Sequence, residues 1–417
     1  MKLITSQDEL IAFCDELAQA DFVTVDTEFL RESSYWPKLC LIQAAGPHGA
    51  AAIDPLAPGI DLAPFYALLA DERVLKVLHA ARQDVEIFVH HGKTMPRPVF
   101  DTQIAAMVCG FGESVGYETL VVTLTGGRID KASRFTNWAN RPLTPAQLEY
   151  AIADVTHLRG VYLRLREQLE QSGRAAWVEE EDAVLTDPST YDVDPERAWL
   201  RLKPRSDNRR FLTVLKHLAA WREREAQSRD TPRQWVLRDD ALLDIAAQAP
   251  TSPETLARSR GIPKGFAEGR LGRGVLEAVN EALAVPEADR PRLASRADMP
   301  AGLAPVVDLL KVLLRANCER HRVAQKLVAG SADLEAIAMD DEAPVPALQG
   351  WRREVFGRDA LALKRGDLAL AIRGRGLALL PVANQEAESA ADASAAVQIG
   401  EVRNGPRRSR RRGERSA

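Results

Sequence analysis

The 417-residue chain has few cysteines, and their spacing excludes two kinds of structural support. The four cysteines are far apart and form no CxxC pair: Cys14, Cys40, Cys109 and Cys318. Structural zinc sites need closely spaced cysteine pairs, and a disulfide framework is not expected in a chain this long. We therefore expect reduced thiols in a cytosolic protein and no structural zinc site.

The sequence also lacks the marks of an exported or membrane-embedded protein. The N-terminus, MKLITSQDEL, has no apolar core of the kind found in signal peptides. No apolar run approaches the length of a membrane span. We expect a soluble, cytoplasmic protein without membrane contact, and nothing in the sequence indicates an obligate protein partner.

The chain is net acidic apart from its C-terminal end. The net charge is −4, and residues 403–417, with seven arginines and one glutamate, carry +6, which leaves −10 for residues 1–402. An acidic body binds RNA only if metal ions and local basic patches offset its repulsion of phosphate. The Ala/Ser/Glu-rich and then arginine-rich stretch 383–417 predicts a disordered basic tail.

Residues 1–170 show alternating strand and helix signals. Three β-rich segments follow one another at short spacing: FVTVDTEFL (22–30), LCLIQAA (39–45) and AAAIDP (50–55). A further strand is expected at 74–79, and helices are expected at 61–70, 81–91, 101–110 and 144–170. This order predicts an α/β domain with a mixed sheet flanked by helices.

The second half of the chain has helical patterns only. A polar, proline-containing linker is expected over 171–207, where Trp199 and Leu202 are candidates to dock on a neighbouring domain. Helical blocks are predicted over 208–285 and 300–380. The two blocks are similar in size, as in a diverged repeat.

Asp26 and Glu28 form the first candidate site. Their i, i+2 spacing on a predicted strand places both carboxylates on one face. Two buried carboxylates repel each other unless a cation lies between them, and hard oxygen ligands favour Mg²⁺ or Mn²⁺. The alternative is a strand end that carries two solvated acids.

Three more residues become candidates by their place on helices. Asp84 lies at the start of the helix that follows strand 74–79, where a structural role at the positive helix end is the alternative. Tyr150 and Asp154 are spaced i, i+4 and share one helical face. Their alternative is a half-buried tyrosine with an exposed aspartate one turn later.

In this order, DxE, a later Asp and YxxxD resemble the three exonuclease motifs of the DEDD superfamily. The YxxxD form resembles the DEDDy branch, and further segments resemble the ribonuclease D family: DTEFLRESSYWPKLCLIQ (26–43), IDPL (53–56), LHAARQD (78–84), FDTQIAA (100–106) and DKASRFTNWANRPLT (130–144). One departure is Asn137, where the family usually has Asp, at a position that is not a metal ligand. The resemblance implies a ribonuclease H-like 3′→5′ exonuclease domain over residues 1–170.

The resemblance also implies a mechanism. Asp26, Glu28, Asp84 and Asp154 would hold two divalent ions, Mg²⁺ or Mn²⁺, and Tyr150 would orient the attacking water. A tyrosine pKa near 10 favours orientation over proton abstraction. The expected product is a 5′-nucleoside monophosphate, and the expected substrate is RNA with a single-stranded 3′ end, such as a tRNA precursor.

Several nearby residues are candidates for binding this substrate. The alternative is that the aromatic residues only pack against the protein and the basic residues only face solvent. Stacking on a terminal base is expected of Tyr35 and Trp36, and phosphate contact is expected of Lys131, Arg134 and Arg141. Trp138 is a further candidate for substrate binding. Asp101 is predicted to be a helix N-cap and not a ligand. His79 is interpreted as a hydrogen-bonded structural histidine.

The helical half resembles the HRDC domain shared by certain helicases and ribonuclease D. WRE (221–223), VLRDDALLDIA (236–246) and the G-x-G element at Gly272 and Gly274 carry the match. The resemblance implies an all-α HRDC domain over 208–285 and a second HRDC-like domain over 300–380. Five arginines are candidates for an RNA-facing patch, with a solvated face as the alternative: Arg222, Arg224, Arg229, Arg233 and Arg238.

Two other functions compete with the exoribonuclease. A proofreading 3′→5′ DNA exonuclease belongs to the same superfamily, but such domains normally accompany a polymerase, and no polymerase-length segment is present. A catalytically inert RNA-binding module is the second alternative. The presence of all five motif residues argues against it.

Overall fold

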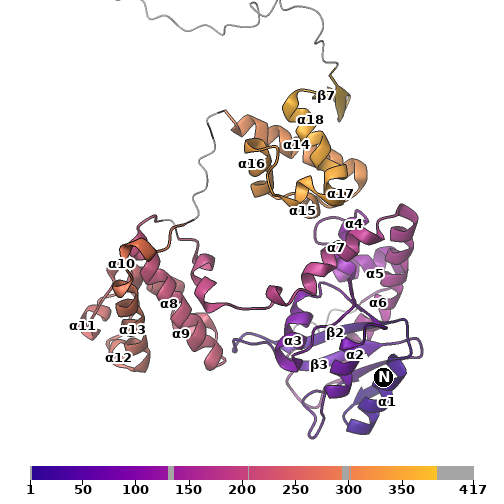
Figure 1. Ribbon diagram of the computed structural model, residues 1–417. Helices are drawn as coiled ribbons and strands as arrows, with labels where there is room; N and C mark the ends of the chain where they lie inside the picture. The colour runs from indigo at the N-terminus through magenta and orange to yellow at the C-terminus, as the bar shows by residue number, and fades with distance from the viewer. Residues whose placement is uncertain (1, 130–135, 205, 294–299, 301, 383–417) are drawn as a thin grey trace, which may run out of the picture. The chain divides into compact units, whose positions relative to one another are not determined.

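The computed structural model describes residues 2–129, 136–204, 206–293, 300 and 302–382 (Figure 1). Two compact units divide the chain, residues 1–360 and 361–417, and their boundary falls within helix α18 (Arg358–Arg365). The expected fold class, an α/β domain with a mixed sheet followed by helical domains, is confirmed.

A six-stranded mixed sheet forms the centre of the first domain. Its strands lie in the order β1 (Lys2–Ile4), β4 (Ala50–Ile53), β3 (Lys38–Ala45), β2 (Phe22–Leu30), β5 (Leu75–Leu78) and β6 (Val99–Asp101). β2 is central, antiparallel to β3 and parallel to β5. The sequence patterns had not predicted β1 and β6, because each strand has only three residues.

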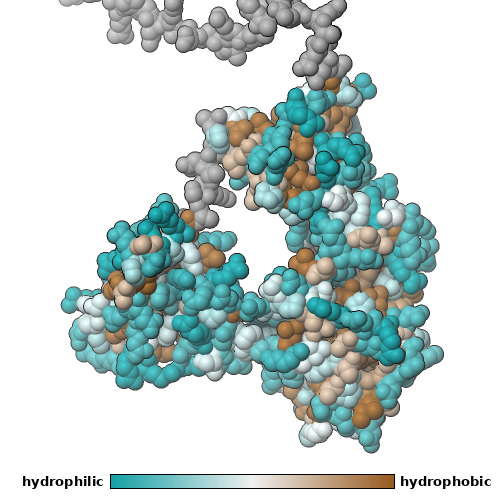
Figure 2. Space-filling model, in the orientation of Figure 1, coloured by the Kyte–Doolittle hydropathy of each residue, from teal (hydrophilic) through white to brown (hydrophobic). Residues whose placement is uncertain are grey.

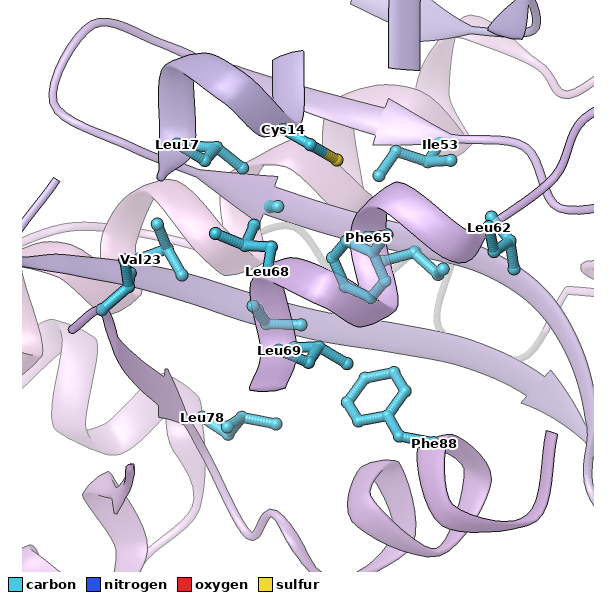
Figure 3. Packing of buried hydrophobic residues seen from close by; sticks show 14 of the residues in the cluster. Cys14, Leu17, Val23, Ile53, Leu62, Phe65, Leu68, Leu69, Leu78 and Phe88 are labelled. Atoms are coloured by element: carbon cyan, nitrogen blue, oxygen red, sulfur yellow. The ribbon is translucent and has the colours of Figure 1, made fainter. Parts of the chain in front are cut away.

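Different helices cover the two faces of β2. Successive side chains of the strand alternate between these two sets of helices. Val23 and Val25 pack in a core with α1 (Gln7–Leu17), α2 (Ala63–Ala70) and α3 (Arg82–Gly92), where Phe65 approaches Phe88 (Figure 3). On the other face, the Thr24 hydroxyl donates to the carbonyl of Val155 in α6 (Pro145–Ser172), 2.7 Å away. Asp26 and Glu28 share this second face.

The segment expected to be a polar linker is largely helical. Within 171–207 lie α7 (Ala175–Leu185) and the short 3₁₀ helices η1 (Pro188–Thr190) and η2 (Pro195–Leu202). Val178 of α7 packs in a core with α4 (Thr102–Val108) and α5 (Tyr117–Thr125). Trp199 packs in the core of the following helical domain, where docking was predicted. The segment is therefore a packed helical connection, because α7 has an apolar side that the neighbouring helices bury.

The next domain is a helical bundle with a single core. Its helices are α8 (Arg209–Ser228), α9 (Arg233–Val236), α10 (Asp239–Gln248), α11 (Pro253–Leu256), α12 (Lys264–Glu268) and α13 (Arg270–Ala284). The G-x-G element allows α13 to approach its neighbours closely. A Cβ atom on Gly274 would lie 2.4 Å from Nε1 of Trp221, and one on Gly272 would lie 2.3 Å from the carbonyl oxygen of Ala267.

Residues 302–382 are not entirely helical. The longer helices α14 (Ala304–His321), α16 (Ser331–Met339) and α18 are accompanied by the short α15 (Gln325–Val328), α17 (Gly350–Arg352), the 3₁₀ helix η4 (Pro346–Leu348) and the π-helical turn η5 (Arg353–Gly357). After α18 the chain forms a hairpin of β7 (Leu368–Arg373) and β8 (Gly376–Pro381). The prediction of helix up to residue 380 is wrong here. Gly374, at φ +60°, permits the tight turn.

Hydrophobic residues lie in small groups on a largely hydrophilic surface, on the face shown in Figure 2. Across the part of the chain that the structure describes, no helix combines the length and apolarity that a membrane crossing needs. The basic tail 383–417 lies outside the described residues.

Candidate active site

Three carboxylates from two elements meet beside the central strand. Asp26 and Glu28 project from β2, and Asp154 projects from α6, which lies on the same face. One possible ligand atom from each residue lies within 4.8 Å of the other two. The donor set consists of hard carboxylate oxygens, which is the chemistry that divalent cations such as Mg²⁺ and Mn²⁺ prefer.

Asp84, the fourth candidate, is held from the opposite side of β2. It lies in the first turn of α3, and its carboxylate accepts a hydrogen bond from the hydroxyl of Thr27. Thr27 faces α3 because it alternates with Asp26 and Glu28. The close three-carboxylate group does not include Asp84. Nevertheless, Asp84 lies near enough to Asp26 for their charges to interact.

Burial without a counter-ion disfavours the ionised forms of these acids. Burial raises the pKa of Asp26 to about 6 from an ordinary value of 3.8, although a backbone hydrogen bond opposes the shift. The pKa of Asp84 is raised well above 3.8, first by burial and then by the charge of Asp26. A cation bound among the carboxylates would remove this electrostatic cost.

Tyr150 lies one helical turn before Asp154 and shares a hydrogen bond with it. Burial raises the pKa of Tyr150 above its ordinary value of 10, and the charges of Asp154, Glu28 and Asp26 raise it further. The phenol therefore keeps its proton at neutral pH. A protonated hydroxyl at this position can donate a hydrogen bond as well as accept one.

A cavity of about 380 Å³ opens beside these residues. Asp26, Tyr150 and Asp154 line one part of it. The remaining wall comes mainly from α5 and its flanks: His79, Gly116, Tyr117, Glu118, Thr119, Ile129 and Leu158.

Asp101 caps α4 as predicted, but its carboxylate also holds the turn before α3. It accepts a hydrogen bond from the backbone N–H of Gln103 at 2.7 Å, which is the N-cap contact. It accepts two more from the N–H groups of Ala80 and Ala81, at 2.9 and 2.8 Å. These contacts fix Ala80 at φ +55° and set the start of the helix that carries Asp84. Sequence reasoning missed this role, because nothing in the local pattern connects residue 101 to residue 80.

Tyr35 and Trp36, expected to stack on a base, are occupied by protein contacts. Tyr35 is 6% exposed, and its hydroxyl donates to Glu223 in the helical domain. The Trp36 ring stacks on His90, with centroids 3.8 Å apart. The packing alternative describes the buried Tyr35, and Trp36 has one ring face covered by His90.

The other substrate-binding candidates give similar corrections. Trp138 is 2% exposed and packs in a core beside Tyr150, so its ring is not available to a base. The Arg141 guanidinium forms a bidentate pair with Asp54, at 2.6 and 2.7 Å, and donates to the carbonyl of Cys40. Arg141 therefore joins the segment before α6 to the sheet, and its guanidinium N–H groups are not free to bind phosphate. Lys131 and Arg134 lie outside the described residues.

Most of the expected arginine patch is also internally paired. Arg222 is 5% exposed and bonds to Asp239. The remaining three ion pairs are Arg224 with Glu196, Arg229 with Glu225 and Arg233 with Glu223. Arg238 is exposed at the start of α10. Arg222 and Arg233 are therefore held by carboxylates within the bundle, whereas Arg224 and Arg229 pair at its surface, with 55% and 38% of their side chains exposed.

Comparison with known proteins agrees with this geometry. A family model described as 3′-5′ exonuclease matches residues 1–170, and one described as HRDC domain matches residues 211–279. Ribonuclease D of Granulibacter bethesdensis is 54% identical over 379 residues, covering 91% of this chain and 96% of that protein. Ribonuclease D of Nitrobacter hamburgensis is 54% identical over 376 residues, covering 90% and 98%.

A solved structure shares the architecture. The crystal structure of Escherichia coli RNase D, described as an exoribonuclease involved in structured RNA processing, matches with a TM-score of 0.76 and 30% identity. The match covers 88% of this chain and 98% of that one. Together with the exonuclease fold and its clustered carboxylates, these similarities show that the chain belongs to the ribonuclease D family of 3′→5′ exoribonucleases.

Proposed function

We propose that Asp26, Glu28, Asp84 and Asp154 hold two divalent metal ions, Mg²⁺ or Mn²⁺, and that Tyr150 orients the attacking water. The observation that supports this most strongly is the group of three carboxylates within 4.8 Å of one another. Metal ions bound at such a site supply an activated water and stabilise the leaving 3′-oxygen.

The side chains of the site have separate roles in this proposal. Asp26 and Glu28 of β2 and Asp154 of α6 present oxygen ligands where α6 covers β2, while Thr27 holds Asp84 on the other side. The protonated Tyr150 hydroxyl can donate one hydrogen bond and accept another, so it can fix the direction of a water molecule. The expected products are 5′-nucleoside monophosphates.

We further propose that the substrates are structured RNAs with single-stranded 3′ ends, tRNA precursors among them. Support comes from the extent of similarity to ribonuclease D proteins, which spans catalytic and helical domains alike. We also propose that the block 300–380 is a second HRDC-like domain, with the hairpin β7–β8 as an addition to it.

An assay of nucleotide release tests the metal site. Asp26→Asn removes one ligand charge, so release from 3′-extended tRNA in Mg²⁺ or Mn²⁺ should fall by orders of magnitude, as should release by the native chain in EDTA. RNA binding should survive. Asp308→Asn, which changes a carboxylate with 72% of its side chain exposed, is the matched control.

Two results would contradict the proposal. Near-native turnover of Asp26→Asn would exclude that residue from the metal site. Equal hydrolysis of a matched DNA strand would favour the alternative of a DNA exonuclease.

A further inference from the structure

His79 lies in the wall of the active-site cavity but is not one of the proposed metal ligands. It follows Leu78, the last residue of β5, and lines the cavity that Asp26, Tyr150 and Asp154 also line. Its ring is tilted against that of Tyr117, with centroids 5.3 Å apart. The position offers an imidazole to whatever occupies the cavity.

The hydrogen bonds around Thr102 fix which ring nitrogen carries the proton. The Thr102 hydroxyl donates its one hydrogen to the carbonyl of Leu78 at 3.0 Å. Its oxygen also lies 3.0 Å from Nδ1 of His79, and in that contact it can only accept. Nδ1 is therefore the protonated nitrogen, and Nε2 carries the lone pair.

His79 also stays neutral at physiological pH. Burial lowers the pKa of its imidazole to about 4 from an ordinary value of 6.5. Among the residues that the structure describes, Nδ1 has a hydrogen-bond partner and Nε2 has none. In this neutral form, Nε2 of His79 can accept a hydrogen bond from a molecule bound in the cavity.

We propose that Nε2 of His79 accepts a hydrogen bond from a ribose hydroxyl of the 3′-terminal nucleotide. This inference rests on the proposed function, which places that nucleotide beside the carboxylates. The 2′- and 3′-hydroxyls are the donors that the terminal sugar offers, and the 2′-hydroxyl is present only in RNA. Contact with the 2′-hydroxyl would make His79 a determinant of RNA over DNA. A structural histidine would need only the Nδ1 contact to Thr102.

Three versions of one oligonucleotide test the proposal. They end in a normal ribonucleotide, a 2′-deoxynucleotide and a 3′-deoxynucleotide, and kcat/KM is measured on each in Mg²⁺. For the native chain, the end that lacks the recognised hydroxyl should react about tenfold more slowly, which is the effect of one neutral hydrogen bond. The hydroxyl whose removal matters identifies the donor.

Two variants separate recognition from folding. His79→Phe keeps a planar ring without an acceptor, so it should be about tenfold slower on the normal end and indifferent to the hydroxyl. His79→Gln keeps an acceptor at the end of its side chain and should recover part of the preference. His217→Phe, at a half-buried histidine of α8, is the matched control and should keep the native preference.

The proposal is overturned if the native chain reacts equally with all three ends, or if His79→Phe discriminates among them as the native chain does or more strongly. It is also overturned if His79→Phe slows all three ends equally, or if His79→Gln is as indifferent as His79→Phe. Asp26→Asn measured in parallel separates this failure from failure of the metal site. If only the His79 assignment is wrong, Asp26→Asn is still inactive, whereas an active Asp26→Asn contradicts the proposed function itself.

Discussion

The hydroxyl of Thr27 donates a hydrogen bond to the carboxylate of Asp84, so a residue between two proposed ligands holds a third. Asp26 and Glu28 face α6 while Thr27 faces α3, and β2 therefore organises both sides of the site. The contact favours the ionised form of Asp84 and opposes the rise in its pKa caused by burial.

Replacing Thr27 with valine should weaken metal activation. Thr27→Val preserves the shape of the side chain but removes the donor, so the pKa of Asp84 rises further and protons compete more effectively with metal. We expect half-maximal activity to need about tenfold more Mg²⁺, with a larger deficit at acidic pH. Thr213→Val, which removes a buried hydroxyl bonded to the carbonyl of Arg209 in α8, is the matched control. An unchanged metal requirement in Thr27→Val would count against this role.

Tyr150→Phe should slow the chemical step and leave binding nearly unchanged. The substitution keeps the packing of the ring and removes the hydroxyl that bonds to Asp154. If that hydroxyl orients water, kcat should fall about a hundredfold with little change in KM. A change in KM alone would reassign Tyr150 to substrate binding. Because its phenol stays protonated, the native activity should not rise with a tyrosine-like pKa near 10.

The metal-free protein should become less stable as pH rises from about 4 to about 6. The pKa of Asp26 is near 6 in the folded chain and near 3.8 when exposed, so the folded state holds its proton more tightly. That contribution to the free energy of unfolding is complete below pH 4 and is lost as pH rises through 6. Melting temperatures in EDTA should show this slope, Asp26→Asn should flatten it, and Mg²⁺ should raise the melting temperature at pH 7. A metal-free protein that gains stability over this window would contradict the electrostatic account.

Glu223→Ala should destabilise the native chain strongly. Glu223 is 1% exposed by its side chain, receives two hydrogen bonds of 2.6 Å from Arg233, and accepts from Tyr35. Its removal leaves the guanidinium and the phenol without the carboxylate that they share, at a cost of about 3 kcal/mol. Thermal or denaturant unfolding measures the loss, with Glu281→Ala, whose side chain is 68% exposed, as the control. Equal stability of the two variants would show that water replaces the lost contacts.

The sequence predicted those parts of the site that depend on periodicity. Alternation along β2 placed Asp26 and Glu28 together, and helical spacing placed Tyr150 against Asp154. Neither pattern carries information about pairs that are distant in the chain. The expectation that Tyr35 stacks on a base was wrong for this reason, because its partner Glu223 lies 188 residues away.

Prediction from the sequence failed where an element is short, or where a side chain contacts a segment distant in the chain. Strands of three residues, such as β1, have no measurable alternation. Arg222, Arg224 and Arg233 resemble part of a basic patch in sequence, yet their carboxylate partners lie on other helices or turns that only the folded chain brings close. Conversely, Asp101 was correctly predicted as an N-cap, because that contact is local.

The contacts of the β2–β3 loop with the helical domain limit how the chain can be recombined. The backbone N–H groups of Tyr35 and Trp36 both donate to Asp230, and the Tyr35 hydroxyl meets Glu223. A chimera that takes its helical domain from another protein would retain this loop but lose the acceptors that hold it. Such an exchange should succeed only when the new helical domain also has the equivalents of Glu223, Asp230 and Arg233, which contact this loop.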